Sequence, residues 1–163
     1  MRRGVRLGVD VGSVRVGVAR SDPHGMLATP VETLRRDRRD RTDLAKLAEL
    51  VREWDVLEVV VGLPVGLSGQ EGAAAGAARS YAGEVAQAVV PVPVRLVDER
   101  LSTVTATTAL RGAGVAARKH RGVVDQAAAV VILQHALDAE RSSGRAPGSV
   151  VGPGPSSRDD TEA

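Results

Sequence analysis

Three acidic residues, Asp10, Glu99 and Asp125, occupy positions in the sequence that suit metal-assisted chemistry. Asp10 lies inside the apolar segment of residues 5–11, where a carboxylate loses hydration and needs a cation or hydrogen-bond donors. Glu99 follows a short strand-like segment, and Asp125 begins the apolar stripe of a helix-like segment. Converging carboxylates raise one another's pKa unless a cation is bound, and Mg²⁺ or Mn²⁺ accepts oxygen ligands of this kind.

Each of these acids also has a purely structural interpretation. Asp10 can accept hydrogen bonds from the amides of the turn that follows it, and Glu99 can pair with Arg100. Asp125 can act as the N-cap of its helix. The spacing therefore supports a metal site as a hypothesis, and it does not identify a reaction.

Apolar patterns predict the elements that position the acids. Alternating residues over 5–11 and 14–18, joined by Gly12-Ser13, predict a hairpin, and residues 27–34 predict a third antiparallel strand. Residues 57–62 and 94–97 are typical of buried parallel strands. Helices are predicted from Thr42 or Asp43, from the capping-box spacing of Ser68 and Glu71, over 103–110, and from Val124 or Asp125 to about Arg141.

This order predicts an α/β fold with a five-stranded mixed sheet, three antiparallel strands followed by two parallel ones, and helices on both faces. If the first strand is central and parallel to the last, Asp10 and Glu99 meet at one edge of the sheet, and Asp125 faces it. We expect one domain over residues 1–141. Residues 142–163 contain 12 Gly, Pro or Ser among 22 residues, which predicts a disordered tail.

Composition excludes several classes of site. The chain has no Cys, so disulfides, thiolate metal sites and a Cys nucleophile are excluded. Aromatic residues make up 1% of the chain, which argues against base stacking on aromatic platforms. No apolar run reaches the length of a membrane span, and no signal peptide is evident, so we expect a cytoplasmic protein without a membrane partner.

Basic residues provide candidate phosphate contacts. Twenty of the 22 basic residues are Arg, the side chain best suited to bidentate phosphate contacts. The segment 35–43 is either a basic loop that meets phosphates or a solvated turn with self-paired charges. Residues 118–122 predict a second basic loop, in which His120 either shuttles a proton or is simply solvated. The candidate substrate-binding residues are Ser13, Arg15, Arg100, Lys119 and Arg121.

Four segments in order carry a resemblance to a known family: VDVGSVRVGVA at 9–19, VVGLPVGLSG at 60–69, DERLST at 98–103 and VDQAAAVVIL at 124–133. Together they resemble the YqgF or RuvX family of ribonuclease H-like nucleases over residues 7–137. The resemblance implies a ribonuclease H-like fold with its acidic positions at Asp10, Glu99 and Asp125. It also implies maturation of the 5′ end of pre-16S ribosomal RNA, or cleavage of Holliday junctions. The family usually has Glu at the position of Thr105, so its capping-box partner for Ser102 is missing here.

The expected protein is a metal-dependent hydrolase that cuts phosphodiester bonds in precursor rRNA or branched DNA, as a monomer or a homodimer. A non-catalytic nucleic-acid-binding module on the same fold is one alternative, and a purely structural partner protein is another. The DVGS turn also resembles a phosphate loop of actin-like ATPases and sugar kinases. Those proteins close two such domains on a nucleotide, whereas 163 residues provide one.

Overall fold

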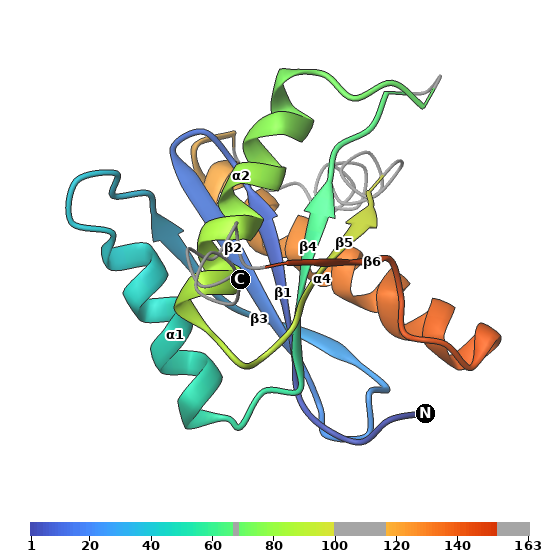
Figure 1. The fold of residues 1–163 in the computed structure, drawn as a ribbon. Helices are drawn as coiled ribbons and strands as arrows, with labels where there is room; N and C mark the ends of the chain where they lie inside the picture. Colours follow the sequence, from blue (N-terminus) through green and yellow to red (C-terminus); the bar gives the residue numbers. More distant parts are fainter. Residues whose placement is uncertain (67–68, 100–116, 153–163) are drawn as a thin grey trace, which may run out of the picture.

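A mixed six-stranded sheet in the order β3-β2-β1-β4-β5-β6 forms the centre of the protein in the computed structural model (Figure 1). The structure describes residues 1–66, 69–99 and 117–152, with side chains in the last range described from Val124 onward. The first three strands pair antiparallel, whereas β1, β4 and β5 run parallel. The strands are β1 (Arg6–Val11), β2 (Arg15–Ser21), β3 (Ala28–Arg35), β4 (Glu58–Leu63), β5 (Val94–Asp98) and β6 (Ser149–Val151).

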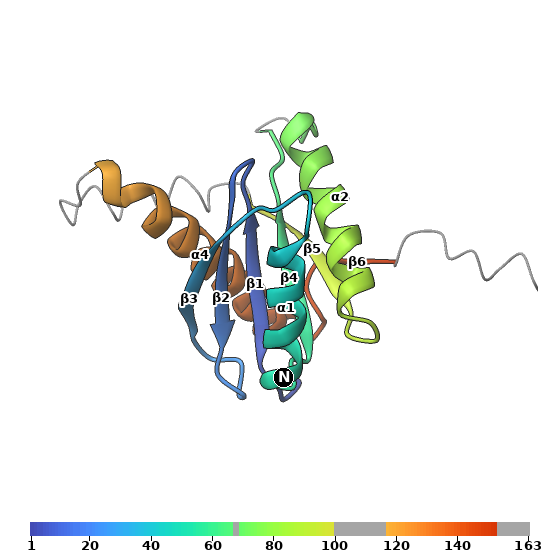
Figure 2. The same ribbon diagram turned by 90° about the vertical axis from the view of Figure 1, so that its left-hand side faces the viewer.

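Helices cover both faces of this sheet, as predicted. Helices α1 (Thr42–Glu53) and α2 (Ala73–Ala88) lie on one face, and α4 (Ala117–Ser143) lies on the other (Figure 2). Alternate residues of the strands divide accordingly: Val9 and Val16 pack in the core beneath α1 and α2, whereas Ala19 and Val60 pack against α4. The period-two pattern of the strands therefore builds two separate cores.

No helix in the described part of the chain is long and apolar enough to cross a bilayer.

Helix α4 begins at Ala117, about two turns before the predicted start. The prediction of a basic loop over 118–122 is therefore wrong, since the backbone there is helical. Gly122 does not interrupt the helix, because a single glycine costs only about 1 kcal/mol in a helix interior. The helix predicted over 103–110 lies outside the described residues.

The predicted helix caps also differ from those observed. The N-cap of α1 is Arg41, in the left-handed conformation at φ 54°, and neither Thr42 nor Asp43 caps the helix. Asp43 is buried instead and accepts a hydrogen bond from the Tyr81 hydroxyl at 2.7 Å. The N-cap of α2 is Gly72, without a side-chain cap, and Glu71 pairs with Arg79 at 2.6 Å. Asp43 and Glu71, which local spacing assigned to helix caps, thus interact with Tyr81 and Arg79 instead.

Part of the segment predicted as a disordered tail forms a strand. Strand β6 pairs antiparallel with β5, so that Val94 lies opposite Val151. Gly148 precedes the strand at φ +64°, and a side chain there would overlap the Leu96 carbonyl oxygen, so this position requires glycine. The open edge of β5 supplies hydrogen-bond partners that composition does not reveal. Residues 153–163 lie outside the described part of the chain.

Candidate functional site

Two strands bring Asp10 and Glu99 to the same edge of the sheet. Asp10 is the fifth residue of β1, and Glu99 directly follows β5. Both strands pair in parallel with β4 between them, so their carboxyl ends point the same way. The Glu99 amide continues this pattern by donating a hydrogen bond to the Leu63 carbonyl at 3.1 Å. The predicted convergence of these two acids follows from strand direction.

Three glycines allow α4 to approach this part of the sheet. Gly8, Gly17 and Gly62 lie on the three adjacent strands β1, β2 and β4. A Cβ atom at Gly17 would overlap the carbonyl oxygen of Asp125, and one at Gly62 would lie 2.5 Å from Glu99 Oε2. A Cβ at Gly8 would lie 2.7 Å from Leu133 Cβ. Asp125 therefore reaches the sheet because these positions lack side chains.

The three acids lie close enough to affect the ionisation of Asp10. Burial, followed by the charges of Glu99 and Asp125, raises the pKa of Asp10 from 3.8 to about 7. Burial also raises the pKa of Glu99, although its hydrogen bond with Asp10 acts in the opposite direction. Burial likewise raises the pKa of Asp125, although Arg15 opposes the shift. Near neutral pH, the site resists carrying three negative charges.

The carboxylates differ in their protein partners. Oxygen Oε2 of Glu99 is buried and has no hydrogen-bond partner among the residues that the structure describes. Asp125 Oδ2 lies 3.4 Å from Arg15 Nε, which forms an ion pair. In the part of the chain that the structure describes, no three Asp, Glu, His or Cys side chains form a complete metal-binding group. Asp10 and Glu99 are thus the hydrogen-bonded pair, and Asp125 is held beside them by Arg15.

The other candidate substrate-binding residues have different positions. Ser13 is exposed in the β1–β2 turn, and its carbonyl oxygen accepts a hydrogen bond from Arg38 Nη2 at 3.3 Å. Lys119 and Arg121 belong to the α4 backbone, but their side chains lie outside the described part. Arg100 and Thr105 also lie outside the described residues. Sequence reasoning did not name Arg36 and Arg38 individually, although the charged segment 35–43 was the signal.

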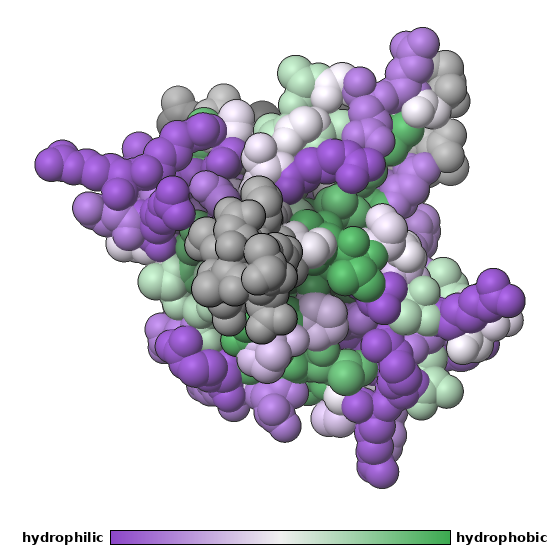
Figure 3. All heavy atoms as spheres, in the orientation of Figure 1, coloured by the Kyte–Doolittle hydropathy of each residue, from purple (hydrophilic) through white to green (hydrophobic). Residues whose placement is uncertain are grey.

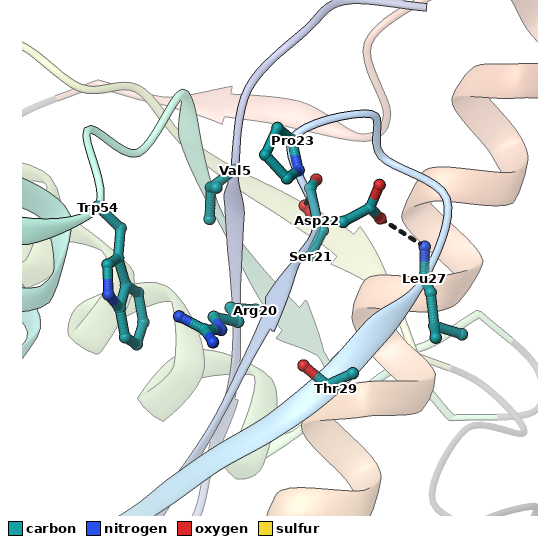
Figure 4. A pocket seen from close by; sticks show the side chains of 8 residues that line it. All are labelled: Val5, Arg20, Ser21, Asp22, Pro23, Leu27, Thr29 and Trp54. Atoms are coloured by element: carbon teal, nitrogen blue, oxygen red, sulfur yellow. Dashed lines mark hydrogen bonds between the residues drawn. The ribbon is translucent and has the colours of Figure 1, made fainter.

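A cavity of about 430 Å³ lies away from the acids, where β1 begins and β2 ends. Figure 4 shows Trp54 and Arg20 on one side of it and the Ser21–Leu27 turn on the other. The Arg20 guanidinium lies 4.4 Å from the centre of the Trp54 ring, a cation–π contact. None of the predicted site residues lines this cavity.

Comparison with known proteins adds independent information. A family model described as "RuvX: Holliday junction resolvase" matches residues 4–139. A protein of a Nocardioides species, named "Putative pre-16S rRNA nuclease", is 59% identical over 93% of this chain and 98% of its own length. A Streptomyces avermitilis protein of the same name is 56% identical, over 93% of this chain and 96% of its own.

The fold has relatives among solved structures. Thermus thermophilus RuvC in complex with a Holliday junction substrate matches with a TM-score of 0.56 and 18% identity. The match covers 85% of this chain and 97% of that one. A second Thermus thermophilus RuvC structure matches with a TM-score of 0.51 and 21% identity. At these identities the likeness concerns the fold, and it confirms the expected ribonuclease H-like architecture.

Proposed function

Because this chain belongs to the RuvX family, we propose that it is a nuclease that hydrolyses phosphodiester bonds at the 5′ end of pre-16S rRNA. The relatives that share more than half of its residues carry this function in their names. The protein would accordingly act in the cytoplasm, where a precursor rRNA is processed. The nuclease class and a nucleic-acid substrate follow from the family, and the finer assignment to one RNA is our proposal.

The observation that carries the proposal is the unfavourable electrostatic environment of Asp10, Glu99 and Asp125, which we call the acidic edge of the sheet. Asp10 has a pKa of about 7, and the Oε2 atom of Glu99 is buried without a hydrogen-bond partner in the described part of the chain. A protein that gained only stability from these residues would satisfy them with donors, since buried unpaired acceptors are costly. Acids held in this state are typical of functional sites.

A divalent cation fits these residues. The donors are carboxylate oxygens, which Mg²⁺ and Mn²⁺ prefer, and Asp10 and Glu99 would hold the ion, with Asp125 completing the set. The unpartnered Glu99 oxygen is the observation that favours this fit. When bound, the ion lowers the pKa of a water molecule and stabilises the negative charge on the leaving oxygen.

The chain's own residues position the reactants. Strand β1 is hydrogen-bonded to β2 on one side and to β4 on the other, so Asp10 is fixed on a strand that is paired along both edges. Arg15 lies beside Asp125 and presents a guanidinium next to the acids. That guanidinium is placed to orient a substrate phosphate, since Arg makes directional contacts with phosphate oxygens.

A second candidate function is the resolution of Holliday junctions. The description of the matching family and the junction-bound RuvC structure favour it. A resolvase cuts two strands symmetrically, which would require a homodimer.

Cleavage of matched substrates separates the two functions. The purified protein would be incubated with a pre-16S rRNA 5′ segment and with a four-way DNA junction, each with Mg²⁺, with Mn²⁺ and with a chelator. We expect metal-dependent cleavage of the RNA at a defined position. Cleavage of the junction alone would support the resolvase, and cleavage of neither would favour the non-catalytic binding module.

A further inference from the structure

Four arginines surround the β1–β2 turn, and we call them the arginine collar: Arg15, Arg35, Arg36 and Arg38. They come from the start of β2, the end of β3 and the loop between β3 and α1. The turn that they surround begins two residues after Asp10, within about 8 Å along the chain. Hydrophilic side chains gather over this β3–α1 loop at the upper left of Figure 3.

The collar is held in place by backbone carbonyl groups. Arg36 Nη1 donates to the Gly12 carbonyl at 3.2 Å, and Arg38 Nη2 donates to the Ser13 carbonyl at 3.3 Å. The Arg36 amide extends the strand pairing by donating to the Val14 carbonyl at 2.8 Å. A guanidinium has five N–H donors, so one carbonyl bond leaves most of them available and leaves the positive charge uncompensated.

The acids of the same loop accept hydrogen bonds from groups other than the collar guanidiniums. Asp37 accepts hydrogen bonds from the amides of Arg39 and Asp40 and from the Thr42 hydroxyl, and the Asp40 amide is the main cause of its lowered pKa. Asp43 is buried against the Tyr81 hydroxyl. Residues 35–41 contain five Arg and two Asp, and within the described residues neither Asp pairs with a collar arginine. The loop is therefore an exposed turn stabilised by hydrogen bonds to Asp37, and in the described part of the chain its collar arginines are not paired with its two Asp residues.

One pair of arginines places two positive charges side by side at this end of the sheet. Arg15 and Arg35 lie directly opposite each other on β2 and β3, an arrangement that is unfavourable for like charges. Asp125 compensates Arg15 at 3.4 Å, whereas the exposed side chain of Arg35 makes no ion pair or hydrogen bond among the described residues. A phosphate group beside Arg35 would relieve this repulsion.

A polar recess adjoins the collar. A cavity of about 170 Å³ is lined by Arg36 and Arg38 and also by Arg41, whose Nη2 atom lies 3.9 Å from Glu84 Oε1. Tyr81 forms its floor, with the Arg36 guanidinium 4.9 Å from the ring centre. Three acids, Asp37, Asp43 and Glu84, also line this recess, so its charge is mixed.

We propose that the arginine collar binds backbone phosphates of the nucleic-acid strand that runs past the β1–β2 turn beside the acidic edge. The proposal rests on the nuclease function proposed above, and it adds a substrate-binding surface on the β3 side of the site. Recognition is through phosphate groups, so it is blind to sequence and positions the strand for cleavage.

The test compares variants of the full-length chain. Arg35→Gln with Arg38→Gln removes two collar charges and spares Arg36, which the β1–β2 turn needs. Arg52→Gln with Arg145→Gln removes the same charge from two exposed positions away from the collar. Arg35→Lys with Arg38→Lys keeps the charge. Binding of an RNA hairpin with a single-stranded extension, and of DNA of the same sequence, is measured in chelator over a range of salt concentrations.

We expect the collar variant to bind RNA and DNA about tenfold more weakly at low salt, with the salt slope reduced by about 1.5 for two lost phosphate contacts. The control pair should match the wild type, and the lysine variant should recover the slope. A collar variant that folds normally and keeps the wild-type slope overturns the proposal. The two proposals fail separately. If the collar variant shows the reduced salt slope but the wild type never cleaves, only the nuclease function is refuted. If the wild type cleaves but the collar variant keeps the wild-type salt slope, only the collar proposal is refuted.

Discussion

At Asp10, burial and the negative charges of Glu99 and Asp125 all act in the same direction, because each disfavours the ionised carboxylate. The neighbouring Arg15 is engaged with Asp125, so Asp10 receives little compensation from it. A residue in this state is well suited to bind a cation and poorly suited to a structural role. Two predictions belong to this residue.

The first prediction concerns turnover. Asp10→Asn keeps the shape of the side chain but removes its charge, so we expect cleavage to be abolished and nucleic-acid binding to be unchanged or tighter. Binding can tighten because a repulsion toward phosphate is lost. Binding and cleavage would be measured separately on one RNA, with exposed Asp138→Asn as the matched control. Near wild-type cleavage by Asp10→Asn in Mg²⁺ would refute the metal-dependent mechanism.

The second prediction concerns stability without metal. The pKa of Asp10 is about 7 in the folded protein and 3.8 ordinarily, so the folded state binds this proton more tightly. Its contribution is fully present below about pH 4 and is lost as the pH rises through about 7, by an amount on the order of 4 kcal/mol. Burial shifts the pKa values of Glu99 and Asp125 in the same direction.

Urea unfolding in chelator at about pH 5 and about pH 8 measures this effect. The wild type should lose more stability between these values than Asp10→Asn, and added Mg²⁺ should reduce the loss at the higher pH. Equal pH dependence of the two proteins would show that Asp10 is not strained in the folded state.

At the scale of elements, the contact between α4 and the sheet determines whether the site exists. Gly8, Gly17 and Gly62 let the helix lie close enough for Asp125 to reach the acidic edge. On the face of α4 that packs against the sheet, the side chains of Ile132, Leu133 and Leu137 are at most 1% exposed and supply the apolar contact that holds the helix there. Small residues on the strands and large ones on the helix therefore act together.

The third prediction follows from this contact. Gly17→Ala places a methyl group where the Asp125 carbonyl lies, so α4 must shift. We expect a loss of about 1–3 kcal/mol of stability and a larger loss of activity, because Asp125 moves with the helix. Gly76→Ala is the control, since it meets open space within α2 and should stabilise the protein by about 0.5–1 kcal/mol. Full activity of Gly17→Ala would contradict the role assigned to Asp125.

Across the whole molecule, the two ends of the parallel strands differ in how their charged side chains are paired. The carboxyl ends of the parallel strands hold the strained acids, whereas the other end holds a compensated ionic network. There Arg2 pairs with Glu58 at 2.7 Å and with Glu140 at 2.6 Å, and buried Arg6 also pairs with Glu140. Arg95 of β5 adds a bond to Glu58 at 2.9 Å. The network connects the N-terminal segment, the three parallel strands β1, β4 and β5, and α4, at the end of the sheet away from the acids.

The fourth prediction concerns the C-terminal segment. A chain ending at Gly152 keeps β6, whereas a chain ending at Ser143 loses it and leaves the β5 edge without a partner. We expect the first truncation to change stability by less than about 0.5 kcal/mol, because residues 153–163 contain almost no apolar side chains. The second should cost about 1–2 kcal/mol, since Val151 loses its packing and Arg95 loses the Pro147 carbonyl. Urea unfolding of both chains measures the difference, and equal stability would mean that β6 contributes nothing.

The sequence by itself determined the parts of this protein that depend on local periodicity. Alternating valines predicted β1 and β2, and the apolar run of 57–62 predicted the parallel strand β4, because side-chain direction follows directly from the backbone period. The same periods placed Asp10 within a strand and Glu99 just after one. The order of these segments was sufficient for the fold class and, through four segments in sequence, for the family.

Tertiary structure alone decided the features that depend on distant partners. The strand β6 and the Arg15–Asp125 ion pair each join residues that no local pattern connects. The hydrogen bonds that Arg36 and Arg38 donate to the β1–β2 turn likewise connect segments that are distant in the sequence. The physical reason is that the partner of a charged side chain or of an edge strand is the group that the fold places next to it. Which groups become neighbours depends on the path of the whole chain.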